Sequence, residues 1–295
     1  MQNLTPDDRR LIRRQEAIED CGMTAEQFEA AFRRLHGDQY VSREALLSAR
    51  EHIVRTVRNA DGEPVVGGMA ASIMHGCRWY DDDFIIELIR HPTGSGRPGL
   101  GSRIHRTDLD ATDVMVVDGI RVTTPIRTAF DLGRIAPEWR ALGYLDDLVR
   151  ATDFPIEELH VYAHNRSRRR RIRQLRNLIP LIDANAESPP ESWVRLLMLR
   201  GDLPTPETQI RVADETGFVF ARIDLGYRLP KIAIEYDGED YHASPEQRAS
   251  DEARDAKLRD LGWIIIRIDR ERLRTAPWSI IIEIDKALRS RGCYY

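Results

Sequence analysis

The chain has 295 residues, of which 42% are hydrophobic and 31% charged, and this composition is typical of a folded globular protein with about two domains. Its formal net charge of −4 excludes a uniformly basic coat for nucleic acid, so any contact with phosphate must come from a local basic patch. The three cysteines lie far apart, fit neither a disulfide framework nor a zinc knuckle, and predict a reducing cytoplasm. Because no apolar run approaches the ~20 residues that span a bilayer, we expect a cytoplasmic protein without a membrane partner.

Residues 1–58 predict a winged-helix-like DNA-binding domain. Within it, residues 6–35 have the pattern of two helices separated by the turn Cys21-Gly22-Met23, and Thr24 is a candidate N-cap for the second helix. A helix-turn-helix has this form, and its second helix reads the major groove of DNA; an ordinary helical hairpin has the same pattern. A further helix is expected over residues 43–58. The side chains that the second helix would present to DNA are Gln27, Arg33 and Arg34.

Residues 59–183 predict a middle α+β domain. The apolar run at residues 84–89 predicts a strand, and residues 115–123 predict a hairpin that turns at Asp118-Gly119. Thr124 and Pro125 then have the residue types of the N-cap and the first position of a helix. Strands and helices therefore alternate irregularly in this part of the chain.

The densest basic run of the chain is the Arg-rich segment, residues 166–176. Guanidinium groups bind phosphate oxygens well, and each such contact releases counterions, so the segment is a candidate nucleic-acid contact. A solvated helix start or a linker whose arginines pair with acidic residues would have the same composition. The side chains in question are Arg168, Arg169, Arg170, Arg171 and Arg173.

A polar, proline-containing break at residues 183–190 predicts a domain boundary, and the C-terminal domain is expected over residues 186–295. Its hydrophobic pattern predicts a mixed sheet flanked by helices. The expected elements are a helix at 191–200, strands at 208–213, 218–226 and 231–238, a helix at 245–261, a strand at 263–268 and a helix at 277–291.

Two of these strands end in acidic residues. Asp224 interrupts one apolar strand, and Glu235 and Asp237 interrupt the next, although a carboxylate inside a hydrophobic strand costs several kcal/mol unless it is paired or bound to a metal. Because side chains alternate along a strand, Glu235 and Asp237 share one face, and Asp224 would join them from the neighbouring strand. Converging carboxylates near a histidine suit a hard divalent cation and a hydrolytic water. The pattern therefore predicts a metal-dependent hydrolase site.

Four short motifs of the C-terminal third carry a resemblance to a known family: Ser188-Pro-Pro-Glu191, Arg222-Ile-Asp224, Ile234-Glu-Tyr-Asp-Gly238 and Leu261-Gly-Trp263. With these residues the chain resembles the PD-(D/E)xK nuclease superfamily, and within it the branch similar to very-short-patch-repair endonucleases. The resemblance implies a restriction endonuclease-like αβββαβ core.

The preceding part of the chain carries a second resemblance. Met69-Ala-Ala-Ser-Ile-Met-His-Gly76 and Asp118-Gly-Ile-Arg-Val-Thr-Thr-Pro-Ile-Arg127 are similar to regions of AbiEi-type antitoxins and transcriptional regulators. The implied fold class is thus α+β with α/β: an N-terminal helix-turn-helix, a middle α+β domain and the nuclease-like core.

The nuclease resemblance also implies roles for individual residues. Asp224 would be the central ligand of Mg²⁺ or Mn²⁺, and Glu235 or Asp237 would complete the ligand set with the backbone carbonyl of Tyr236. Glu191 would hold a metal-bound water or orient a base. The remaining implied roles are proton transfer by His242, its orientation by Asp251, and phosphate binding by Arg254 and Arg267.

The chain departs from the superfamily pattern at Asp237, which occupies the position usually filled by a lysine. In the similar very-short-patch-repair branch a histidine and a further aspartate replace that lysine, and His242 and Asp251 match their places. Two hypotheses remain open: a metal-dependent DNA endonuclease, or a DNA-binding regulator or antitoxin whose nuclease-like domain is inactive. Action on RNA is a third. A homodimer and a toxin or other defence-system partner are compatible with either of the first two.

Overall fold

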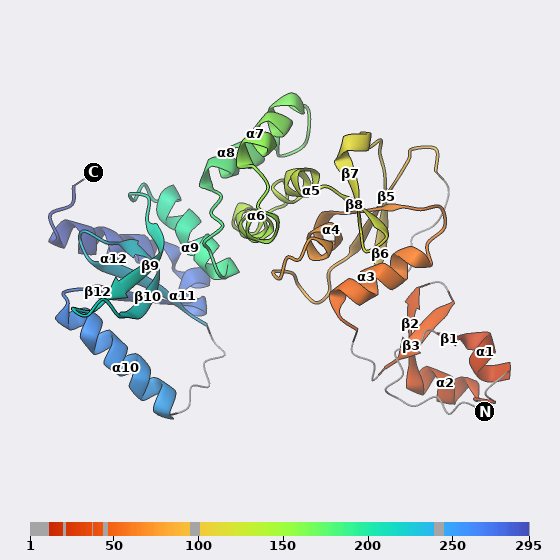
Figure 1. Ribbon diagram of the computed structural model, residues 1–295, viewed down its shortest axis with the longest axis horizontal. Helices are drawn as coiled ribbons and strands as arrows, with labels where there is room; N and C mark the ends of the chain where they lie inside the picture. Colours follow the sequence, from red (N-terminus) through yellow and green to blue (C-terminus); the bar gives the residue numbers. More distant parts are fainter. Residues whose placement is uncertain are drawn as a thin grey trace. The chain divides into compact units, whose positions relative to one another are not determined.

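The computed structural model describes residues 12–19, 22–36, 38–43, 47–94, 101–238 and 245–294 (Figure 1). The chain forms two compact units; the first consists of Met1–Leu132 with Ala151–Ser167, and the second of Gly133–Arg150 with Arg168–Tyr295. Several sheets occur together with helices, which confirms the expected mixed α/β character. The finer division into three domains stays a prediction. None of the helices in the described ranges is both long enough and apolar enough to cross a membrane.

The N-terminal part of the first unit combines short helices with a small sheet. Thr24 caps the second helix as expected, because its side chain accepts the N–H of Gln27 at 3.1 Å while the Gln27 side chain accepts the N–H of Thr24 at 2.9 Å. The strands that the structure describes here pair in the order β1-β3-β2. The elements are β1 (Ile12–Arg13), α1 (Arg14–Glu19), α2 (Ala25–Ala31), β2 (Phe32–His36) and β3 (Gln39–Ser42).

The expected second helix is wrong in its C-terminal part. The helix ends at Ala31, the backbone of Phe32 is already extended (φ −122°, ψ 147°), and Arg33 and Arg34 lie on strand β2 opposite residues of β3. Phe28 of α2 and Phe32 of β2 still stack, with ring centroids 5.1 Å apart. The apolar spacing that favours a helix therefore brings the two rings together although Phe32 lies on a strand. Arg33 and Arg34 therefore do not belong to a recognition helix.

The larger sheet of the first unit has the strand order β6-β5-β4-β8-β7 among the described residues. Its core contains Ile53, Val66, Ile86, Leu88 and Val122; α4 packs on β5, and α5 packs on α4 and α7. The expected helix at 43–58 begins later, at Ala49, because Ser48 caps it. The strands are β4 (Val65–Gly67), β5 (Ile86–Arg90), β6 (Ser102–Arg106), β7 (Val114–Val117) and β8 (Ile120–Thr123). The helices are α3 (Ala49–Arg58), α4 (Gly68–Met74), η1 (Ala111–Asp113), α5 (Pro125–Leu132) and α7 (Ile156–Asn165).

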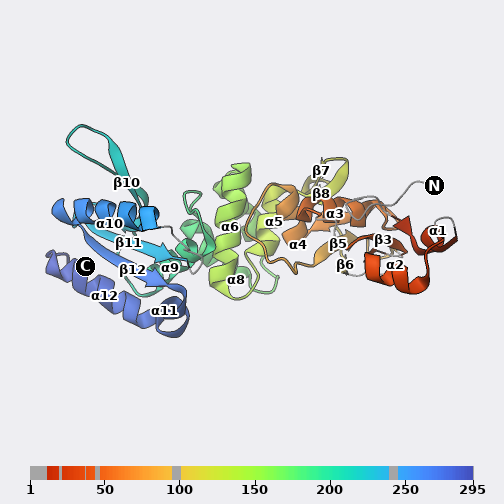
Figure 2. The same ribbon diagram turned by 90° about the horizontal axis from the view of Figure 1, so that it is seen from below.

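The second unit is built around a sheet with the order β12-β11-β10-β9, in which β11 and β12 are parallel and the other pairs antiparallel. Helix α10 covers one face of this sheet, and α11 and α12 cover the other (Figure 2). The strands are β9 (Glu207–Ala213), β10 (Val219–Tyr227), β11 (Ile232–Asp237) and β12 (Ile264–Asp269). The helices are α6 (Glu138–Thr152, which enters the first unit after Arg150), α8 (Ile172–Leu178), η2 (Ile179–Leu181), α9 (Pro189–Arg200), α10 (Pro245–Asp260), α11 (Arg270–Thr275) and α12 (Pro277–Ser290).

Aliphatic side chains of three strands form the main core of this unit. Ile232 and Ile234 of β11 pack with Leu225 of β10, Ile266 of β12 and Ile284 of α12. The alternate residue of β11, Ala233, belongs to the cluster on the other face, which includes Leu258 of α10. Because the residues of β11 alternate in this way, Glu235 faces the side of the sheet that α10 covers.

We expect Gly226→Ala to destabilise the second unit by about 2 kcal/mol or more, because a Cβ atom on Gly226 would overlap the Ile232 carbonyl oxygen of the neighbouring strand. Calorimetric unfolding of the full chain measures the change. Gly238→Ala is the matched control, since its Cβ would meet no atom of the described residues within 4 Å, and it should change stability by less than about 0.5 kcal/mol. Equal effects of the two substitutions would contradict the packing of β10 against β11.

Candidate active site

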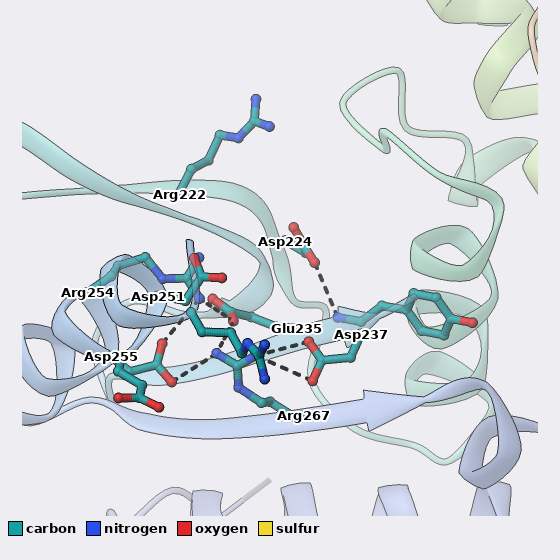
Figure 3. Close-up of a pocket in the computed structure, with 11 residues that line it drawn as sticks. Arg222, Asp224, Glu235, Asp237, Asp251, Arg254, Asp255 and Arg267 are labelled. Atoms are coloured by element: carbon teal, nitrogen blue, oxygen red, sulfur yellow. Dashed lines mark hydrogen bonds and ion pairs between the residues drawn. The ribbon is translucent and has the colours of Figure 1, made fainter. Parts of the chain in front are cut away.

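The second unit contains a pocket of about 450 Å³ beside β10, β11, β12 and α10 (Figure 3). All of its lining residues except Tyr236 are acidic or basic. The lining residues are Arg222, Asp224, Glu235, Tyr236, Asp237, Arg248, Asp251, Glu252, Arg254, Asp255 and Arg267. The pocket thus collects most of the acidic residues that the sequence singles out.

Glu235 and Asp237 lie on the same face of β11 and meet the same arginine. Glu235 pairs with Arg267 in the parallel register of β11 and β12. Arg267 Nη1 donates to Asp237 Oδ1 at 3.0 Å, and Arg267 Nη2 lies 3.4 Å from Glu235 Oε2 (Figure 3). Asp237 is therefore neutralised by a guanidinium at the mouth of the pocket.

Asp224 of β10 lines the pocket and directly precedes Leu225, where the pairing between β10 and β11 begins. The N–H of Tyr236 donates to Asp224 Oδ2 at 3.2 Å, so the carboxylate lies against β11 (Figure 3). Burial raises the pKa of Asp224 from its ordinary 3.8 to about 6, and the negative charges of Glu191 and Glu235 add to this effect. Glu191 and Glu235 are therefore each close enough to Asp224 to repel its charged form.

Glu191 is buried in the first turn of α9 and is held by several donors. Ser188 Oγ donates to Glu191 Oε1 at 2.7 Å, and the N–H of Glu187 and Gln209 Nε2 each donate to Oε2 at 3.0 Å. Gln209 lies on β9 at the gap in the ladder opposite Asp224, where its φ of 51° breaks the regular strand. Strain of this kind persists where the surroundings fix it, often next to a functional site. Gln209 carries no signal in the hydrophobic pattern, and the sequence analysis missed it.

Glu235 is buried, and its main partner is an arginine of α10. Arg254 Nη2 donates to Glu235 Oε2 at 2.7 Å and to Asp255 Oδ1 at 3.2 Å. Burial raises the pKa of Glu235, although the charges of Arg254 and Arg267 oppose the rise. Asp255, also buried, accepts from Arg259 and Arg267 as well, and sequence reasoning missed it because an aspartate in a strongly charged helix has the pattern of a solvated residue.

Whether the site suits a divalent cation depends on which oxygens are available. Among the described residues, no three acidic, histidine or cysteine side chains are grouped as a ready metal site. Glu235 Oε1, however, is buried without a hydrogen-bond partner in the described structure, and Glu235 lines the same pocket as Asp224, whose charged form it repels. These two carboxylates fit a cation that would relieve the repulsion, whereas Asp237 would first have to leave Arg267.

Of the two other predicted catalytic residues, Asp251 and His242, the structure describes Asp251. Asp251 of α10 lines the pocket, so it lies on the same side as Glu235 (Figure 3). His242 lies outside the described residues, and its role stays a prediction. The roles of the Tyr236 carbonyl and of Asp237 as metal ligands stay predictions as well.

The predicted nucleic-acid contacts of the second unit fall into two groups. Arg254 and Arg267 are engaged in ion pairs inside the pocket. The side chains of the Arg-rich segment are exposed just before and within α8, where Ile172 and Leu175 anchor the helix and Arg171 has a left-handed backbone (φ 57°). The exposed members are Arg168, Arg169, Arg170, Arg171 and Arg173.

Comparison with known families identifies two regions of the chain. Residues 206–288 match the restriction endonuclease-like family REase_MTES_1575, and residues 85–181 match the AbiEi antitoxin C-terminal domain. The nuclease-like and AbiEi-like resemblances are confirmed at this level, while the very-short-patch-repair branch and the PD-(D/E)xK assignment stay predictions.

Two relatives are similar over most of their length. The uncharacterized proteins MT2308 and Rv2248 of Mycobacterium tuberculosis, from strains CDC 1551 and H37Rv, are each 32% identical to this chain over 192 residues. The matched part is 65% of this chain and 70% of each relative. No solved structure matches the chain significantly.

We expect Asp224→Asn to stabilise the protein at pH 8 by about 2 kcal/mol. The rise of the Asp224 pKa from 3.8 to about 6 corresponds to about 3 kcal/mol, and the partial exposure of Asp224 reduces this value. The folded pKa is raised, so the contribution of Asp224 to stability is complete below pH 3.8 and is lost as the pH rises through about 6. The gain from the substitution should therefore shrink as the pH falls from 8 to 5.

Calorimetric unfolding of both proteins across this range measures the effect. Asp260→Asn, at an exposed position of α10, is the control and should change stability by less than about 0.5 kcal/mol at every pH. A gain from Asp224→Asn that is equal at pH 5 and pH 8 would contradict the raised pKa.

Proposed function

The chain belongs to the same family as the mycobacterial proteins MT2308 and Rv2248, and we propose that it is a DNA endonuclease that hydrolyses phosphodiester bonds with Mg²⁺ or Mn²⁺. The observation that carries the proposal is the cluster of Asp224, Glu191 and Glu235 beside one pocket of a restriction endonuclease-like domain. Burial, followed by the charges of Glu191 and Glu235, raises the pKa of Asp224, and a bound cation would relieve this repulsion.

The cation would be held by Asp224 and by Glu235 through Oε1, which has no hydrogen-bond partner among the described residues, with Asp237 and the Tyr236 carbonyl as further ligands. When bound, it supplies charge neutralisation for the transition state and lowers the pKa of a bound water. The Tyr236 N–H holds Asp224 in position for this. Ser188 and Gln209 hold Glu191 so that its carboxylate stays close to Asp224.

Proton transfer falls to the remaining polar groups of the site. Glu191 would orient the attacking water, and His242 would accept or deliver the proton, because an imidazole titrates near neutral pH. Asp251 lines the same pocket and would orient His242. Arg248 lines the pocket and would bring positive charge for the phosphate backbone, whereas Arg222 is already paired with Glu187 at 2.6 Å.

DNA would be bound chiefly by the Arg-rich segment. Arg168 to Arg171 and Arg173 project into solvent, where guanidinium groups form charge-assisted hydrogen bonds to phosphate. The AbiEi antitoxin domain supports DNA binding and a toxin–antitoxin setting. In the N-terminal part, Gln27 of α2 and Arg33 and Arg34 of β2 would contribute from a helix and a strand rather than from one recognition helix.

A second candidate function is a DNA-binding regulator or antitoxin with an inactive nuclease-like domain. The ion pairs of Glu235 with Arg254 and of Asp237 with Arg267 favour it, because each arginine neutralises a carboxylate that a cation would need. Its partner would be a toxin or another defence-system protein. A homodimer is compatible with both functions, and in a nuclease it would allow both DNA strands to be cut.

Incubation with supercoiled plasmid and Mn²⁺ tests the enzyme against the regulator. We expect nicking that requires the metal and that falls about 100-fold or more in Asp224→Ala, because that substitution removes the central carboxylate. Asp260→Ala, an exposed acid of the same domain, is the control and should cleave like the wild type. Retardation of DNA without cleavage under all metal conditions would support the regulator instead.

Replacement of Arg169 and Arg170 by Gln should weaken DNA binding and lower the slope of log K against log salt concentration by about 2, since each phosphate contact contributes about 0.9. Fluorescence anisotropy of a labelled duplex between 50 and 200 mM salt, about the range over which such contacts lose most affinity, measures the slope. The control changes the exposed Arg274 and Arg291 of the C-terminal helical region to Gln, an equal change of charge elsewhere on the chain. Equal slopes for the two double variants would exclude the Arg-rich segment as the contact.

A further inference from the structure

The two partners of the central ion pair each carry a buried atom that the pair leaves unsatisfied. Glu235 Oε1 and Arg254 Nε are both buried, and neither has a hydrogen-bond partner in the part of the chain that the structure describes. One is an acceptor without a donor and the other a donor without an acceptor. Such atoms cost free energy unless a further group satisfies them.

The chemistry of the two atoms points to two different ligands. A carboxylate oxygen in a pocket with other carboxylates suits a divalent cation. A guanidinium N–H suits an anionic oxygen, and a phosphodiester supplies such an oxygen beside the position of the cation. In the present arrangement the ion pair opposes the binding of a cation, because the guanidinium of Arg254 lies 2.7 Å from Glu235 Oε2 and would repel a cation there.

The surroundings allow Arg254 to change partners without leaving the site. Asp255 accepts from Arg254 at 3.2 Å and also from Arg267 at 2.8 Å, so it retains both arginines when Glu235 is released. The Arg254 side chain is 27% exposed and faces the pocket, whereas the Glu235 side chain is only 8% exposed and stays in place (Figure 3). The arginine is therefore the member of the pair that moves.

We propose that Arg254 gates the cation site: it occupies Glu235 in the free protein and transfers to a phosphate of the bound nucleic acid, and only then does Glu235 bind the divalent cation. The inference rests on the proposed nuclease function and adds the order of events. Nucleic acid and cation then bind cooperatively, and by thermodynamic linkage each raises the affinity of the other by the same factor. The free protein is kept from acting as a metal-loaded nuclease.

Manganese binding to the full-length protein tests the gate without a measurement of cleavage. Electron paramagnetic resonance counts free Mn²⁺ in titrations of the protein alone and with a phosphorothioate DNA duplex, which keeps the backbone charge. We expect the duplex to tighten Mn²⁺ binding about tenfold or more. Arg254→Gln should tighten Mn²⁺ binding to the DNA-free protein by a similar factor and abolish the further effect of DNA.

The matched control is Arg259→Gln, because Arg259 lies on the same helix and pairs with Asp255 at 3.3 Å without contacting Glu235. It should behave like the wild type. Glu235→Gln in the Arg254→Gln background should remove the gain in affinity, which assigns the cation to Glu235. If a variant does not fold, the Mn²⁺ titrations of the wild type with and without the duplex still test the gate.

Equal Mn²⁺ affinity of the wild type with and without the duplex would overturn the gate. If the plasmid is still nicked in that case, the proposed nuclease function stands without it. Absence of Mn²⁺ binding in every protein, with or without DNA, together with absence of nicking, would overturn both the gate and the nuclease function.

Discussion

The site depends on one constraint: Glu235 continues a buried strand and cannot be solvated there. The strand that carries it, β11, is held between two apolar clusters, so the carboxylate cannot move to the surface. A buried carboxylate without a counter-charge would be strongly destabilising, and Arg254 from α10 and Arg267 from β12 provide that charge. Asp255 accepts from both of these arginines and holds them beside Glu235. The charged residues that surround Glu235 in the pocket follow from this one buried carboxylate.

The two halves of the pocket therefore differ in charge balance. Around Glu235 and Asp237 the carboxylates are paired with arginines. Around Asp224 and Glu191 they are held by neutral donors, namely the Tyr236 N–H, Ser188 and Gln209, and burial together with repulsion raises the pKa of Asp224. An added cation is favoured in the second half and opposed in the first, so Asp224 is the natural anchor for it.

Strand periodicity made part of this site predictable. The alternation of β11 places Glu235 and Asp237 on one face, and the two contact one arginine as a result. Asp255 and Gln209 were not predictable, since the first has the pattern of a solvated helix residue and the second owes its place to an irregular backbone. Helical spacing of Phe28 and Phe32 favours a helix through Arg33, and pairing with β3 overrides that preference.

The PD-(D/E)xK resemblance, which stays a prediction, implies a lysine after the second acid of the motif. Asp237 occupies that place in this chain, and Arg267 reaches it from β12 at 3.0 Å. An arginine supplies charge but remains protonated at any physiological pH, so it cannot take a proton from water. Under the proposed function, the proton must then pass to Glu191 or His242, which separates charge stabilisation from proton transfer in this site.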